Sequence, residues 1–68
     1  MPSTAIEHVS YNEAARELSV TFVGGGTYTY YGVPKQVYSA FREAPSKGQF
    51  VNSYVRDRYD YRRHPRPH

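Results

Sequence analysis

Arginine and tyrosine are interleaved in the last thirteen residues of the chain, a combination typical of proteins that bind single-stranded nucleic acid. Residues 1–55 contain equal numbers of basic and acidic side chains, so the net charge of +3 lies entirely in residues 56–68. Arginine presents a planar set of donors to phosphate and also stacks on flat rings. We therefore predict an anionic partner, with a solvated tail or intramolecular ion pairing as the alternative. The predicted nucleic-acid contacts are Arg56, Arg58, Tyr59, Tyr61, Arg62, Arg63 and Arg66.

A lysine at a predicted helix start is a further candidate for phosphate binding. Residues 46–49 have the Ser-x-x-Gln spacing of a capping box, which predicts that a helix begins at Lys47. The free N–H groups of a helix start, with the Lys47 charge beside them, suit a phosphate. A simple helix cap explains the same residues, and the two interpretations are compatible.

Three tyrosines near the middle of the chain divide between the two faces of a strand. Tyr28 and Tyr30 share one face, and we expect that face to pack on the core because a small domain needs large apolar groups. Tyr31 then points the other way and is a candidate for stacking on a base. If the hairpin register is reversed, Tyr28 and Tyr30 instead form an exposed two-ring platform.

The chain offers little for catalysis or metal binding. It has no cysteine, and no residue at a suitable spacing orients His8, His64 or His68 as a catalytic base. His64 and His68 also lie among arginines, which repel a cation. We therefore expect no catalytic residues, no metal site and no cofactor, and nothing indicates a small-molecule substrate.

A chain of 68 residues forms one small domain with a modest core. The absence of disulfides in so small a domain favours the cytoplasm. No apolar run approaches the roughly 18 residues of a membrane span, so we expect no membrane association. A protein partner or a homodimer would stabilise so small a core.

Apolar alternation predicts three strands with short connections. Alternate apolar residues from Leu18 to Phe22 mark the clearest strand. Ile6 and Val9 are out of step in the preceding strand, which indicates a bulge or a twist between them. Residues 24–26 are all glycine, and the β-branched and aromatic residues after them favour a hairpin turn over a phosphate-binding loop. The predicted strands are residues 5–12, 18–23 and 27–31.

Apolar residues at helical spacing follow the third predicted strand. Val37 and Phe41 lie on one face of a predicted helix that has Pro34 at its first position and ends before Pro45. The second helix is predicted over residues 47–56.

These elements predict a small α+β domain over residues 5–61. A three-stranded antiparallel meander would carry two short helices packed on one face. Residues 1–4 would form a leader. The basic tail of residues 62–68 has no apolar period, and we expect it to be disordered when free.

Several motifs in this order resemble one known family. Tyr28-x-Tyr30 joined to Gly32-Val33-Pro34 is the most telling, together with the downstream Ala-x-Ser-x-Gly pattern of residues 44–48. They resemble the KTSC domain, which is named from its occurrence at the C-terminus of some lysyl-tRNA synthetases and is also found as a small protein of bacteria and phages. The other matching stretches are Val9-Ser10-Tyr11-Asn12, Leu18-Ser19-Val20-Thr21-Phe22, Val37-Tyr38 and Gln49-Phe50-Val51-Asn52.

The function of that family is not established, and the resemblance implies no catalytic residues. Its link to synthetases implies RNA as the nucleic acid. We therefore expect a non-enzymatic module that binds nucleic acid, with RNA favoured. The alternative is a protein–protein interaction module or small assembly subunit that uses the open sheet edge or an exposed tyrosine face.

Overall fold

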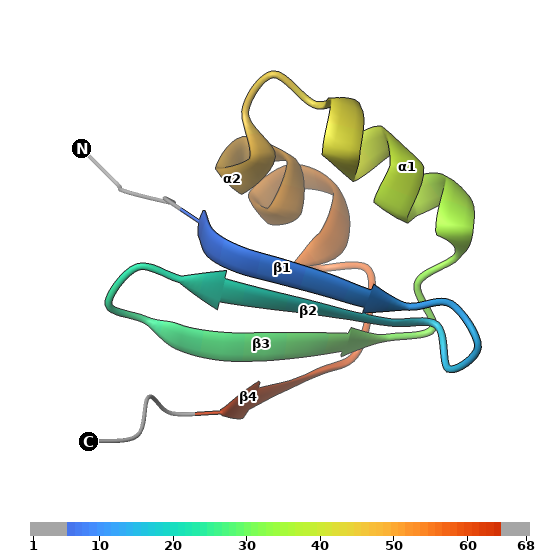
Figure 1. The fold of residues 1–68 in the computed structure, drawn as a ribbon, viewed down its shortest axis with the longest axis horizontal. Coiled ribbons are helices and arrows are strands. Elements are labelled where there is room, and N and C mark those ends of the chain that lie inside the picture. Colours follow the sequence, from blue (N-terminus) through green and yellow to red (C-terminus); the bar gives the residue numbers. More distant parts are fainter. Residues whose placement is uncertain (1–5, 65–68) are drawn as a thin grey trace.

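The computed structural model describes residues 6–64, in which three strands are followed by a helical segment and a fourth strand (Figure 1). The strands form one antiparallel sheet in the order β1-β2-β3-β4, and the helices lie over one of its faces. An α+β fold with helices on one face of a meander is therefore confirmed. The elements are β1 (Ile6–Asn12), β2 (Glu17–Phe22), β3 (Gly26–Tyr31), α1 (Lys35–Glu43), α2 (Lys47–Phe50), the π-helix η1 (Val51–Val55) and β4 (Tyr61–His64).

The core lies between the sheet and the helices. Alternation along β2 sends Leu18 and Val20 to this face, where both side chains are fully buried. The helical segment contributes one buried apolar side chain from α1 and two from η1. The buried apolar residues are Leu18, Val20, Tyr30, Val33, Phe41, Val51 and Val55.

The opposite face of the sheet is polar, and the helices do not cover it (Figure 1). Ser19 and Thr29 are direct partners on β2 and β3, and their hydroxyl oxygens share a hydrogen bond of 3.1 Å. The next pair along, Thr21 and Thr27, shares one of 2.8 Å. The period-two pattern of the sequence thus separates an apolar face from a hydroxyl-bearing one.

Both predicted irregularities of the first two hairpins are present. The register of β1 against β2 shifts between Ile6 and His8, which shows that the first irregularity is a bulge. Residues Gly24 and Gly26 have φ angles of 75° and 83°, in the left-handed region that only glycine enters without strain. The glycine triplet is therefore the predicted hairpin turn between β2 and β3.

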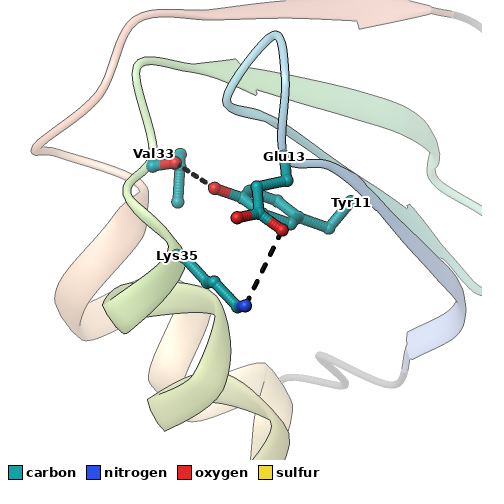
Figure 2. Close-up of polar contacts among 4 residues, drawn as sticks. All are labelled: Tyr11, Glu13, Val33 and Lys35. Atoms are coloured by element: carbon teal, nitrogen blue, oxygen red, sulfur yellow. Dashed lines mark hydrogen bonds and ion pairs between the residues drawn. The ribbon is translucent and has the colours of Figure 1, made fainter.

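The start of α1 is held against the first hairpin (Figure 2). The Tyr11 hydroxyl of β1 donates a hydrogen bond of 2.7 Å to the carbonyl oxygen of Val33, just before the helix. The Tyr11 ring also stacks on Tyr38 of α1, with centroids 4.5 Å apart. A more exposed ion pair joins Lys35 Nζ to Glu13 Oε1 at 3.7 Å. Together these contacts set where α1 crosses the sheet.

The ends of α1 follow the sequence with one difference. The helix ends at Glu43, two residues before Pro45, as predicted. Pro34 is the N-cap rather than the first helical residue, because its ψ of 157° is extended. A proline needs no N–H partner at either position, so the sequence alone did not separate them.

The second helical segment changes type along its length. It begins at Lys47 as predicted, and the Gln49 N–H donates to Ser46 Oγ at 3.4 Å. After α2 the wider turns of η1 take over, and the Arg56 N–H donates to the Val51 carbonyl oxygen at 2.8 Å. Short π-helical turns occur frequently at functional sites.

The C-terminal region corrects the sequence prediction. Residues 62–64 of the predicted disordered tail join Tyr61 in β4 (Tyr61–His64), so the meander has four strands rather than three. The open edge of β3 supplies unpaired N–H and C=O groups, and β4 pairs with them. The predicted leader of residues 1–4 and the tail residues 65–68, including Arg66, lie outside the described residues.

Candidate functional site

The register between β2 and β3 decides which tyrosines face the core. Tyr28 pairs with Val20 and Tyr30 with Leu18, so both tyrosines lie on the face that the helices cover. Tyr30 is 2% exposed, and Tyr28 is partly buried against the core. The expectation that these two residues face the core is therefore confirmed.

The fourth strand adds an aromatic ring to this pair. Tyr61 is the direct partner of Tyr30, and its ring centroid lies 5.7 Å from that of Tyr30 and 5.5 Å from that of Tyr28. The Phe22 and Tyr28 rings pack edge to face, with their centroids 5.6 Å apart. Tyr61 remains 53% exposed. An array of aromatic rings therefore runs from the core to the surface at this edge of the sheet.

These rings line a pocket of about 220 Å³, which we call the tyrosine pocket. Asn52 of η1 and Arg56, four residues later, face the rings from the helical side. The pocket residues include no carboxylate. They are Phe22, Gly25, Tyr28, Tyr30, Asn52, Arg56 and Tyr61.

A second arginine lies beside the tyrosine pocket. Arg63 is the direct partner of Tyr28 across β3 and β4, and its guanidinium carbon lies 6.0 Å from the centroid of the Tyr28 ring. This is within the range of a cation–π contact. Because Arg63 is exposed, its donors also face solvent. The pocket thus combines aromatic walls with two positive charges.

The hydroxyl of Tyr30, the most buried tyrosine of the pocket, is held protonated. Burial raises the pKa of Tyr30 to about 12, and the neighbouring Tyr28 and Tyr61 hydroxyls add to this effect. The positive charge of Arg56 partly opposes it by favouring the phenolate. At neutral pH the Tyr30 side chain is therefore a neutral hydroxyl that can donate a hydrogen bond.

The structure brings together three of the residues predicted from the sequence, namely Arg56, Tyr61 and Arg63. Arg58 and Tyr59 instead line a separate groove against α1. Lys47 starts α2, where its Nζ donates to the Ala44 carbonyl oxygen at 3.4 Å.

Two further predicted residues lie on the polar face of the sheet. Arg62 pairs with Thr29, and Tyr31 pairs with Glu17. Tyr31 is 37% exposed, so it is available for stacking but is not part of the tyrosine pocket. Alternation along β4 therefore divides its two arginines between opposite faces of the sheet.

Sequence reasoning missed Phe22, Gly25 and Asn52 as pocket residues. The spacing of Asn52 and Arg56 was the available signal, since residues four apart on a helix share a side. This spacing does not show that the two side chains meet the edge of the sheet at β4. Within residues 6–64, no three His, Asp or Glu side chains gather as metal ligands would. No helix in that range is long and apolar enough to cross a membrane.

Comparison with known proteins places the chain in a family. The model of the KTSC domain matches residues 2–59. A protein of Tsukamurella paurometabola is 44% identical over 57 residues, which are 84% of this chain and 85% of that protein. The crystal structure of a KTSC domain protein from Yersinia pestis has a TM-score of 0.84 and 32% identity, covering 93% of this chain and 89% of that one.

A longer relative shows the same domain in another setting. The lysine–tRNA ligase of Nostoc punctiforme is 31% identical over 58 residues, which are 85% of this chain but 10% of the ligase. The resemblance seen in the sequence motifs is therefore confirmed along nearly the whole chain. On these matches of sequence and fold, the chain belongs to the KTSC domain family.

Proposed function

We propose that this KTSC domain is a non-enzymatic cytoplasmic module that binds single-stranded nucleic acid, with RNA favoured, at the tyrosine pocket. The observation that carries the proposal is the placement of Arg56 and Arg63 at an aromatic pocket whose residues include no carboxylate. Aromatic rings beside a basic groove are the usual means of binding single strands without strong sequence preference. The similarity to a lysine–tRNA ligase supports RNA over DNA.

Charge and stacking have separate roles in this proposal. Arg56 and Arg63 would bind backbone phosphates, and each contact would release counterions, so affinity would fall steeply with salt. Tyr61 and Tyr28 would supply ring faces for the bases. Arg62 lies on the other face of the sheet and would add to the general attraction of anions.

Fluorescence anisotropy with a labelled single-stranded RNA at several salt concentrations tests the proposal. The double variant Arg56→Ala/Arg63→Ala should bind more weakly, and the slope of log affinity against log salt should fall by roughly 1.4, about 0.7 for each lost contact. A matched control, Arg16→Ala/Arg42→Ala, removes the same charge at two exposed positions outside the pocket and outside the predicted contacts, and it should leave the slope nearly unchanged. Equal losses in both double variants would show that charge alone, and not this site, attracts RNA.

A groove on the helical side supports the alternative of a protein-interaction module. It has a volume of about 330 Å³, and Val37 and Ala40 of α1 face Tyr54 of η1 across it. Tyr54 is 54% exposed. The edge of β3, in contrast, is already paired with β4. Sedimentation over a range of concentrations tests self-association: a mass that rises above 7.9 kDa and falls on Tyr54→Ala substitution would favour this alternative.

A further inference from the structure

The tyrosine pocket has the size of one ring system rather than of a folded ligand. Its volume of about 220 Å³ lies below the roughly 300 Å³ at which sites for drug-sized molecules begin. Two of its walls are the faces or edges of Tyr28 and Tyr61, whose planes are tilted by 42°. The pocket therefore has room for a flat group beside the exposed Tyr61 ring.

Polar groups of the pocket match the edge of a nucleobase. The Asn52 side-chain amide both donates and accepts hydrogen bonds, as base edges do. Tyr30 also lines the pocket, and its neutral hydroxyl can donate a hydrogen bond. A purely apolar ring would displace water from these groups without replacing its hydrogen bonds, whereas a base can supply them.

The positive charge at the pocket favours a nucleotide over a methylated ammonium group, the other usual ligand of aromatic pockets. Cages of aromatic rings bind methylated ammonium groups through the negative faces of the rings. Here Arg56 lines the pocket and Arg63 lies over Tyr28, so a cation would be repelled. A flat ring that carries a phosphate fits both the walls and the charges.

Resting on the proposed function, we infer that the tyrosine pocket takes a single unstacked base of the bound strand. The base stacks on Tyr61 and Tyr28, and its edge meets the Asn52 amide. Arg56 and Arg63 bind the phosphates next to that base. The domain therefore distinguishes a strand with bases from a bare phosphate backbone of equal charge.

The test compares a labelled single-stranded RNA with an abasic strand of the same length by fluorescence anisotropy. The wild-type chain should bind the intact strand about tenfold more tightly, the scale of one stacked base. Tyr61→Ala should reduce this preference to twofold or less. Tyr54→Ala is the matched control, because Tyr54 is 54% exposed and Tyr61 53%. It should keep the tenfold preference.

A second variant covers the case in which Tyr61→Ala does not fold. Because Asn52 is exposed, Asn52→Ala should fold. This variant should show smaller differences in affinity among RNA strands of uniform A, C, G or U. The slope of log affinity against log salt should stay the same. Equal binding of intact and abasic strands by the wild-type chain would overturn the inference while leaving the proposed RNA binding in place.

If neither strand binds, the proposed function fails and the pocket is examined by itself. The probes are then the four nucleoside monophosphates, with inorganic phosphate as the control, followed by NMR of the full chain. Shifts of the Asn52 side-chain amide and the Tyr61 backbone amide with a monophosphate, but not with phosphate, would retain the pocket as a nucleotide site. Their absence would overturn the inference as well.

Discussion

Arg63 and Tyr28 face each other as direct partners on β4 and β3, with the guanidinium carbon 6.0 Å from the ring centroid. This contact joins the charge of the C-terminal segment to the tyrosines of the sheet. A similar contact occurs on α1, where the guanidinium carbon of Arg42 lies 5.9 Å from the Tyr38 centroid. The two arginine–tyrosine contacts can therefore be compared, because they have similar distances and only the Arg63–Tyr28 contact adjoins the tyrosine pocket.

Replacing Arg63 should affect binding more than stability. Because exposed cation–π contacts contribute about 0.5–1 kcal/mol, Arg63→Ala and Arg42→Ala should lower the free energy of unfolding by similar small amounts. Only Arg63→Ala should weaken RNA binding. Arg63→Lys keeps the charge but loses the planar stacking group, so it should preserve the salt slope and reduce the affinity. Urea denaturation and anisotropy measure the two effects; a loss of RNA affinity in Arg42→Ala equal to that in Arg63→Ala would contradict the prediction.

Alkaline pH should destabilise the domain through Tyr30. The pKa of Tyr30 is raised to about 12 from 10.0, so the folded chain holds this proton more tightly than the unfolded chain does. The resulting stabilisation is fully present below pH 10 and is lost as pH rises through about 12. A shift of this size corresponds to at most about 3 kcal/mol.

Tyr30→Phe isolates this effect because phenylalanine has no proton to lose. Denaturation curves between pH 9 and pH 11.5 should show a smaller decline in the free energy of unfolding for Tyr30→Phe than for the wild-type chain. The other tyrosines are common to both proteins and cancel in the comparison. The same pH dependence in the two proteins would show that Tyr30 is not the responsible group.

Removing β4 should cost stability as well as binding. A chain that ends after Asp60 loses the four cross-strand pairs of β4 and exposes the edge of β3. At about 0.2–1 kcal/mol for each pair, the free energy of unfolding should fall by roughly 1–3 kcal/mol. A chain that ends after His64 keeps β4 and is the control. Thermal unfolding followed by circular dichroism compares the two shortened chains. Identical melting temperatures would mean that β4 does not contribute to the stability of the fold.

The two polar contacts at the start of α1 should differ in strength (Figure 2). Tyr11→Phe removes a hydrogen bond of 2.7 Å from a partly buried site and should cost about 1 kcal/mol. Glu13→Gln removes an ion pair whose two side chains are each 66% exposed, and it should cost less than about 0.5 kcal/mol. Urea denaturation measures both, and the reverse order would refute this ranking.

Local patterns predicted most of the fold. The glycine triplet predicted the hairpin turn, the displaced apolar residues Ile6 and Val9 indicated the irregularity that the structure shows to be a bulge in β1, and Pro45 marked the end of α1. Each of these depends on the conformational preferences of a few neighbouring residues, which the sequence states directly. The strand β4 has no such signal, because Arg62 and Arg63 interrupt any apolar alternation. Its stability depends on the edge of β3, which lies more than thirty residues earlier in the chain.

The sequence by itself determined the family, the order of the first three strands and helices, and the concentration of charge in the last thirteen residues. Only the tertiary structure decided that Arg56 and Tyr61 meet Tyr28 and Tyr30 at one pocket, with Arg63 beside it. It also decided that Arg58 and Tyr59 lie elsewhere. The physical reason is that strand register and helix placement set which side chains share a face, and both are fixed by contacts between distant segments.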